Sequence, residues 1–190
     1  MVESRDISLF LKLPDVIKTI GGIVLVDRPT VGMLKQLSLL GHDPRRKMLL
    51  FCEKQGKAAG LKSRLAQKGF KNAAVFLGDM PQFSPLKRRS ASAIIMPLPY
   101  IEENEMLRLL RKAAGMLEDD GLLILHSPVR GRILGLGEHL VRVLFLQERG
   151  LPEEHTVVSL ALRGGFNRIE KHRMGGIRPR LFILARKNTL

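Results

Sequence analysis

Short runs of consecutive apolar residues recur along the chain. Five runs and a sixth near the end cover residues 22–26, 48–52, 73–77, 93–96, 122–125 and 181–185. Each run is almost entirely apolar and does not alternate with polar residues, which is typical of strands buried on both faces of a parallel sheet. The pattern therefore predicts a sheet with helices on both sides.

The segments between these runs carry apolar residues at helical spacing. Helices are predicted at residues 31–40, 58–67, 105–117 and 133–146, with another starting near Pro152 and running through 156–162. An amphipathic stretch at 7–20 contains Pro14, which favours a kink or a break over one straight helix. Residues 168–173 and 180–186 have strand character and flank a Gly-Gly pair and a proline, so an antiparallel hairpin is expected.

Strands that alternate with helices imply right-handed crossovers and a three-layer, doubly wound α/β fold with a mostly parallel sheet. Residues 80–89 are expected to form an exposed loop, and Asp119-Asp120-Gly121 a turn into the next strand. A length of 190 residues suits one hydrophobic core. We therefore expect an N-terminal helical segment, residues 1–20, and a single α/β domain over residues 21–190.

Composition narrows the class of protein. Hydrophobic residues make up 45% and charged residues 26%, as in ordinary soluble domains. No apolar run reaches the roughly 18 residues of a transmembrane helix, and the start MVESRDISLF does not have the pattern of a signal peptide. The single cysteine, Cys52, excludes an internal disulfide and a cysteine-rich zinc site. These observations favour a cytoplasmic protein.

The net charge of +14 is the most unusual property of the chain. A positive field of this size attracts polyanions such as nucleic acid or anionic lipid. The basic residues are nevertheless spread along the chain, and aromatic residues, at 5%, offer few platforms for stacked bases. A solvated basic surface therefore ranks ahead of specific nucleic-acid binding. Apolar residues within 9–20 or 133–146 would suit the face of a homodimer.

Four local motifs, in this order, resemble the class I S-adenosylmethionine (SAM)-dependent methyltransferases. They are MLLFCE at 48–53, FKNAAVFLGD at 70–79, LRLLRKAAGMLEDDGLLIL at 107–125, and a closing GGFNRIEKHRMGG with RLFILARK. The resemblance implies a SAM cofactor. It assigns Glu53 to the ribose hydroxyls, since one carboxylate accepts two hydroxyl donors, and Asp79 to the adenine amino group.

The first motif of that family, a glycine-rich turn after the first strand, is altered here. The corresponding sequence is IVLVDRPTVGML. Gly32 is the glycine that remains in it, and Asp27 stands in for the acid near the strand end. Glycines let the backbone approach the cofactor closely. Arg28 and Thr30 are expected to crowd the pocket, and Pro29 removes a backbone donor.

His126 ends the fifth apolar run, at the edge of the sheet where α/β sites open, so it is a candidate general base; structural packing is the favoured alternative. Three functions follow. The chain is a SAM-dependent methyltransferase of unnamed acceptor, a pseudo-methyltransferase acting as a binding or assembly module, or a basic nucleic-acid-binding domain. No ligand spacing among the five histidines indicates a metal site.

Overall fold

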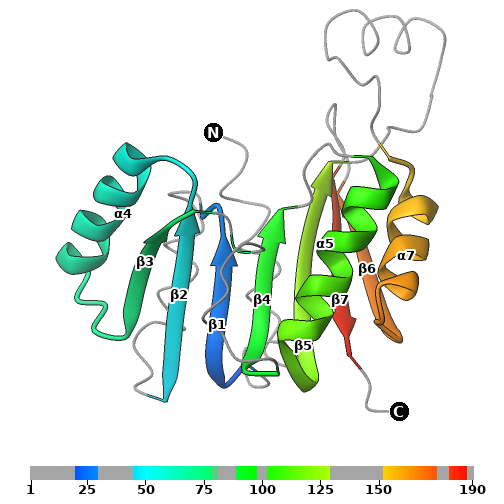
Figure 1. The fold of residues 1–190 in the computed structure, drawn as a ribbon, viewed down its shortest axis with the longest axis horizontal. Helices are drawn as coiled ribbons and strands as arrows, with labels where there is room; N and C mark the ends of the chain where they lie inside the picture. The colour runs from blue at the N-terminus through cyan, green and yellow to red at the C-terminus, as the bar shows by residue number, and fades with distance from the viewer. Residues whose placement is uncertain are drawn as a thin grey trace, which may run out of the picture.

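The computed structural model describes residues 20–29, 45–78, 80, 89–97, 102–128, 152–174 and 180–187. These residues form one seven-stranded sheet in the order β3-β2-β1-β4-β5-β7-β6, with three helices (Figure 1). The strands are β1 (Gly22–Asp27), β2 (Arg46–Cys52), β3 (Ala73–Leu77), β4 (Ala91–Pro97), β5 (Leu117–Pro128), β6 (Arg168–Met174) and β7 (Arg180–Arg186). The helices are α4 (Gln55–Gln67), α5 (Glu103–Met116) and α7 (Glu154–Arg163).

The predicted doubly wound sheet with a closing hairpin is confirmed. β3, β2, β1, β4 and β5 pair in parallel, whereas β7 runs antiparallel to both β5 and β6. All six apolar runs are strands, and the helices expected at 58–67, 105–117 and 156–162 are present with slightly shifted ends. The helices expected at 31–40 and 133–146, and the segment 7–20 apart from Ile20, lie outside the described residues. The division into residues 1–20 and 21–190 therefore stays a prediction.

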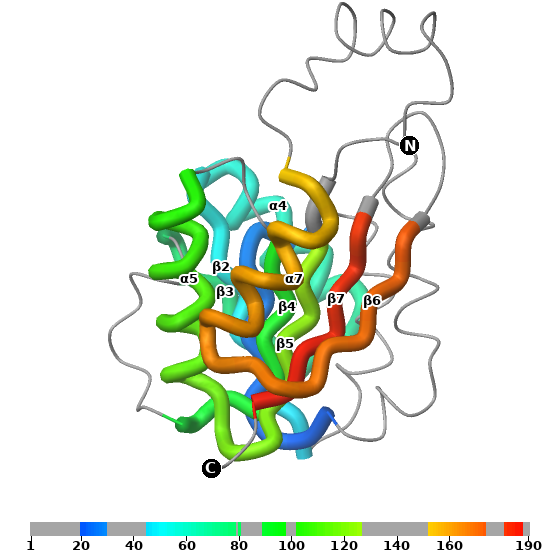
Figure 2. Tube along the Cα trace, turned by 90° about the vertical axis from the view of Figure 1, so that its right-hand side faces the viewer, coloured from blue at the N-terminus to red at the C-terminus, as the bar shows by residue number. Residues whose placement is uncertain are grey.

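Side chains alternate between two cores, one on each face of the sheet. In β1, Val24 and Val26 join the core under α4, and Leu25 joins the core under α5 and α7. The same alternation runs through the other inner strands, as expected for a period of two residues. Figure 2 looks from the β6 edge of the sheet and shows α5 and α7 on the same side of β6 and β7. Both faces of the inner strands are thus buried, which explains their continuous apolar runs.

The turn expected at residues 119–121 does not come before the strand, because these residues belong to β5 and form a bulge within it. The helix α5 ends at Met116 and the strand starts at once at Leu117. The irregularity is a register shift opposite Ala91 and Ala93, where Asp120 has a φ of +64°. Lys187 pairs with this segment on both sides, since its carbonyl accepts from the Asp120 N–H and its own N–H donates to the Gly121 carbonyl. The pairing with the chain end fixes a bulge, in which Asp120 and Gly121 both face Lys187.

The strand order reverses between β1 and β4, because the chain leaves β1 toward β2 and β3 and then returns to β4 on the other side. The carboxyl ends of the five parallel strands share one edge of the sheet. In open α/β sheets, ligands bind at this edge, beside the point where the order reverses. Within the described residues, no helix is long and apolar enough to cross a membrane.

Candidate functional site

Two carboxylates lie at the carboxyl edge of the sheet, at the ends of adjacent strands. Asp27 is the last residue of β1 and lies opposite Phe51 in the register with β2. Glu53 directly follows the end of β2. The Asp27 side chain is 6% exposed, and the Glu53 side chain is 45% exposed. The buried carboxylate therefore faces the protein, and the exposed one is accessible to a ligand.

Arg28 lies between the two carboxylates. Its Nη2 is 2.5 Å from Glu53 Oε1, and its Nε is 3.7 Å from Asp27 Oδ2. The Arg28 N–H donates to the Phe51 carbonyl at 2.9 Å, which extends the β1–β2 ladder by one residue. Because the backbone then turns with a φ of +48°, the guanidinium reaches across the end of β2. A non-glycine residue in this region is strained by about 1–2 kcal/mol, which the ion pairs help to offset.

This ion pair bears directly on the role expected of Glu53. A ribose would donate its hydroxyls to this carboxylate, and the guanidinium contacts one of its two oxygens, Oε1. Arg28 and Glu53 are 38% and 45% exposed, so the pair is open to water and its strength is limited by solvent screening. A ligand that approaches Glu53 at this edge would therefore share the carboxylate with Arg28 or displace the guanidinium.

Cys52, next to Glu53, does not act as a nucleophile in this arrangement. Burial raises the pKa of the Cys52 thiol; the positive charge of Lys57 lowers it and the negative charge of Asp27 raises it. A thiol with a raised pKa stays protonated at neutral pH and is a poor nucleophile. Cys52 instead packs in the core under α4.

The end of β3 joins the same edge. The Gly78 N–H donates to the Cys52 carbonyl at 2.9 Å, and Gly78 has a φ of +125°, a conformation that favours glycine. Asp79 follows this turn, but it lies outside the described residues, as does Gly32. The cofactor roles expected of Asp79 and Gly32 therefore stay predictions.

His126, the candidate base, lies near the carboxyl end of β5. Its ring stacks on Phe182 of β7, with centroids 4.8 Å apart and an interplanar angle of 24°. Phe182 is also its register partner across the β5–β7 ladder. Phe182 belongs to the core under α4, so the contact gives His126 a packing role on that face of the sheet. In the described part of the chain, no cluster of His, Cys, Asp and Glu side chains could hold a metal ion.

The sequence reasoning identified Arg28 as a crowding residue and missed its partner. Arg28 comes one residue after β1, and Glu53 comes one residue after β2. Side chains that immediately follow two adjacent parallel strands lie at the same edge. The sequence signal for the ion pair was therefore a basic residue shortly after one apolar run and an acidic residue directly after the next.

Of the comparisons with known proteins, the one with solved structures identifies the fold. No protein-family model matches the chain, and no curated sequence is significantly similar to it. Among solved structures, the S-adenosylmethionine-dependent methyltransferase SibL matches 98% of the chain with a TM-score of 0.73 and 16% identity. An O-methyltransferase family protein from Burkholderia thailandensis matches 99% with a TM-score of 0.70 and 12% identity. The chain has the fold of the class I SAM-dependent methyltransferases.

The chain spans little more than half the length of these two structures, since the matches cover 56% of SibL and 57% of the Burkholderia protein. A third structure of the same fold is the [4+2]-cyclase SpnF, with a TM-score of 0.68 and 13% identity over 95% of this chain and 81% of that protein. The methyltransferase-like fold therefore also occurs in a protein named for a different reaction, and function must be argued from the site.

Proposed function

We propose that the chain binds SAM at the carboxyl edge of its sheet and transfers the methyl group to an acceptor that neither sequence nor fold names. The observation that carries this proposal is the position of Glu53, a half-exposed carboxylate at the end of β2, beside the reversal of strand order. The methyltransferases among the structures of the same fold support it. Cytoplasmic location and homodimer formation stay predictions.

In this proposal, the residues of the site hold and orient the cofactor. Glu53 accepts the ribose hydroxyls once Arg28 has left it, and Asp27 keeps Arg28 and the turn after β1 in place. As the resemblance implies, Asp79 contacts the adenine amino group. Gly32 lets the backbone come close to the cofactor. SAM supplies an electrophilic methyl group on a sulfonium. The protein contributes mainly by aligning that group with the acceptor and excluding water.

The ion pair favours a second candidate, a pseudo-methyltransferase that keeps the fold as a binding or assembly module. Arg28 occupies the carboxylate that a ribose would need, and it does so from the turn where the family has glycine. A chain that no longer binds SAM has no need of an open turn at this point. The two candidates differ in whether Arg28 moves aside when ligand is present.

Calorimetric titration of SAM and S-adenosylhomocysteine, at moderate salt, separates these candidates. If Glu53 holds the ribose, Glu53→Gln weakens binding more than tenfold, about 1.4 kcal/mol. Arg28→Gly tightens binding, because it frees Glu53 and glycine accepts the positive φ without strain. Arg89→Gly is the matched control: Arg89 has a φ of +56° and pairs with Asp119 at 3.4 Å, but it precedes β4 at the opposite edge. That variant should bind as the wild type does.

Three results decide the question. Micromolar binding by the wild type, lost in Glu53→Gln, supports the methyltransferase. Binding by Arg28→Gly alone means that the arginine closes the site, and supports the pseudo-methyltransferase. If neither the wild type nor Arg28→Gly binds at millimolar ligand, while circular dichroism shows that both are folded, the assignment of Glu53 to a cofactor is overturned.

A further inference from the structure

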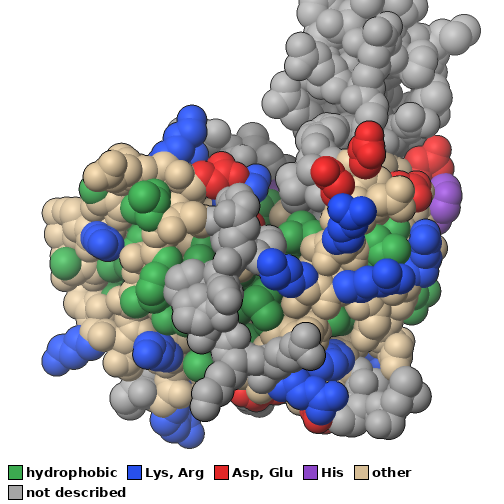
Figure 3. All heavy atoms as spheres, in the orientation of Figure 1, with side chains coloured by type: hydrophobic (Ala, Val, Ile, Leu, Met, Phe, Trp, Pro, Cys, Tyr) green, Lys and Arg blue, Asp and Glu red, His purple; other side chains and the backbone are tan. Residues whose placement is uncertain are grey.

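The helix α4 and its flanks carry positive charge alone. Between residues 54 and 71 the sequence has no aspartate and no glutamate. It has six basic residues, all of them exposed: Lys54, Lys57, Lys62, Arg64, Lys68 and Lys71. On the face shown in Figure 3, the side chains over α4 and β3 include blue ones and no red ones. We call these six residues the α4 basic face.

Among the described residues, no carboxylate neutralises the charges of the α4 basic face through an ion pair. Some basic side chains elsewhere meet carboxylates, as in Arg28–Glu53, Arg89–Asp119 and Lys171–Glu154. Within the part of the chain that the structure describes, no residue of the α4 basic face forms an ion pair. Like charges gathered on one helix repel each other by a few tenths of a kcal/mol per neighbouring pair. A polyanion would relieve this repulsion.

Three of these residues form a stripe along the helix. Lys57, Arg64 and Lys68 are separated by seven and four residues, so they project from the same side of α4. At 1.5 Å per residue, the stripe is about 16 Å long. The core-facing side, formed by Ala58, Leu61 and Leu65, is adjacent to the stripe and buried. The three cations of the stripe can each contact one phosphate of a nucleic-acid strand.

The residues between the charges decide which polyanion fits. The exposed side of α4 has only small or polar side chains between its cations: Gln55, Gly56, Ala59, Gly60, Ser63, Ala66 and Gln67. A helix that lies on a membrane needs large apolar side chains to insert among the lipids, and the leucines of α4 are buried. A phosphate backbone needs only charge and close approach. We propose that the α4 basic face is a docking surface for a nucleic-acid strand, held through its phosphates.

The position of α4 relates this surface to the candidate site. The helix starts at Gln55, two residues after Glu53, and returns to the amino-terminal edge where β3 starts. A strand bound along α4 would therefore have one end beside Glu53. Docking itself requires neither SAM nor Glu53, so it stands or falls separately from the proposed function.

Fluorescence anisotropy of a labelled single-stranded dT20 oligonucleotide, titrated with the full chain between 50 and 200 mM NaCl, tests the proposal. The triple variant Lys57→Gln, Arg64→Gln, Lys68→Gln changes the stripe. Its matched control is Arg108→Gln, Arg111→Gln, Lys112→Gln, which removes three exposed charges from α5, where Glu103 and Glu105 are also present. Both variants lower the net charge by three, so a general charge effect would be equal in the two.

If the stripe holds phosphates, only the α4 variant loses affinity. The slope of log Kobs against log salt should become shallower by about 2, since each phosphate contact on a single strand contributes about 0.7. Equal losses in the α4 and α5 variants would overturn the proposal, because they would show attraction by net charge alone. Cosedimentation with phosphatidylserine vesicles, without binding to dT20, would also overturn it and would indicate a membrane surface. Calorimetry with SAM on the same variants distinguishes a failed docking surface from a failed cofactor site.

Discussion

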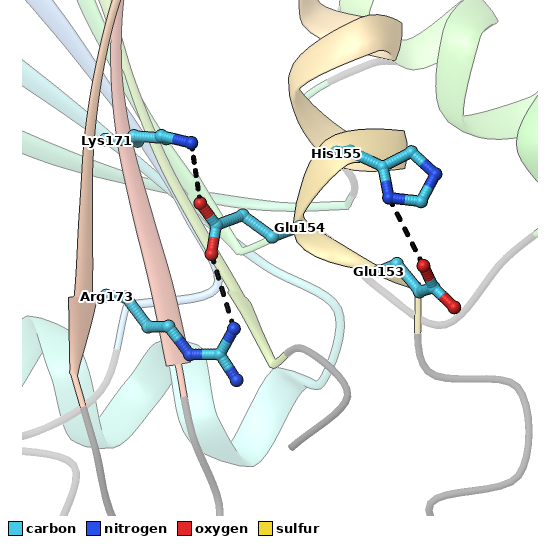
Figure 4. A network of polar contacts seen from close by, with 5 residues as sticks. All are labelled: Glu153, Glu154, His155, Lys171 and Arg173. Carbon is cyan, nitrogen blue, oxygen red and sulfur yellow. Dashed lines mark hydrogen bonds and ion pairs between the residues drawn. The ribbon is translucent and has the colours of Figure 1, made fainter. Parts of the chain in front are cut away.

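At the residue scale, Glu154 shows how a carboxylate outside the candidate site joins two elements. It opens α7 and reaches β6, where Oε1 lies 2.8 Å from Lys171 Nζ and Oε2 lies 3.3 Å from Arg173 Nη1 (Figure 4). The neighbouring Glu153 instead contacts His155 on its own helix, 3.2 Å away. The hydrogen bond from Lys171, followed by the charges of both cations, lowers the pKa of Glu154 despite its partial burial. The ionised form therefore stabilises the fold.

Glu154→Gln should lower the free energy of unfolding at pH 7 by about 1 kcal/mol, the upper range for partly exposed pairs. The folded pKa is below the unfolded one, so the stabilisation is present above about pH 4.3 and is lost as the pH falls through the folded pKa. Urea unfolding at pH 7 and at pH 3 measures the difference. Glu170→Gln on β6 removes the same charge and should have little effect. A loss at pH 7 that persists unchanged at pH 3 would contradict this account.

At the scale of elements, α5 and α7 pack through a glycine contact. Gly164 follows α7, and a Cβ at this position would lie 2.9 Å from the Cβ of Leu110, a fully buried residue of α5. The Gly164 N–H also donates to the Leu160 carbonyl at 2.8 Å, which ends the helix. At Gly115, within α5, a Cβ would project into open space, with no neighbouring atom within 4 Å. A methyl group therefore has no room at Gly164 but fits without a clash at Gly115.

Gly164→Ala should lower the free energy of unfolding by about 1–3 kcal/mol, because the methyl group forces α5 and α7 apart. Gly115→Ala should raise it by about 0.5–1 kcal/mol, since alanine loses less conformational entropy in a helix. Urea unfolding of both variants measures the pair. A neutral or stabilising Gly164→Ala would show that the contact between the helices is looser than the structure has it.

At the scale of the whole molecule, charge opposes compactness. A net charge of +14 concentrated in one folded domain repels itself more strongly than in the expanded chain. The α4 basic face contributes to this repulsion, and so do cations elsewhere. Salt shortens the range of the repulsion, from a Debye length of about 30 Å at 0.01 M to about 8 Å at 0.15 M.

Raising NaCl from about 0.01 to 0.15 M should therefore raise the thermal unfolding temperature, by about 2–4 °C if screening contributes about 1 kcal/mol. The α4 and α5 triple variants should both show a smaller increase, and an equal one, because this effect depends on total charge. Differential scanning calorimetry measures it. An unchanged salt dependence in both variants would mean that self-repulsion contributes little to stability.

Most of the fold could be predicted because its signals are local. The apolar runs marked six of the seven strands, although the edge strand β3 is only partly buried, and the helical spacing marked α4, α5 and α7. The place of the segment 119–121 as a bulge within β5 could not be predicted, since it depends on pairing with Lys187, far along the chain. The candidate site was predicted as a set of separate acids, and Asp27 and Glu53 do lie at adjacent strand ends. Arg28 was singled out as a crowding residue, but its pairing with both acids depends on β1 and β2 being neighbours in the sheet.

The sequence by itself determined the layered α/β architecture, because burial on both faces of a strand imposes a run of apolar residues whatever lies beside it. It also determined the net charge and the single-signed segment between residues 54 and 71. Only the tertiary structure decided which charges meet. Arg28 pairs with Glu53, and Glu154 with Lys171, across elements that pairing and packing bring together. Charge pairing depends on distances of a few ångströms between side chains, and those distances exist only once the sheet has formed.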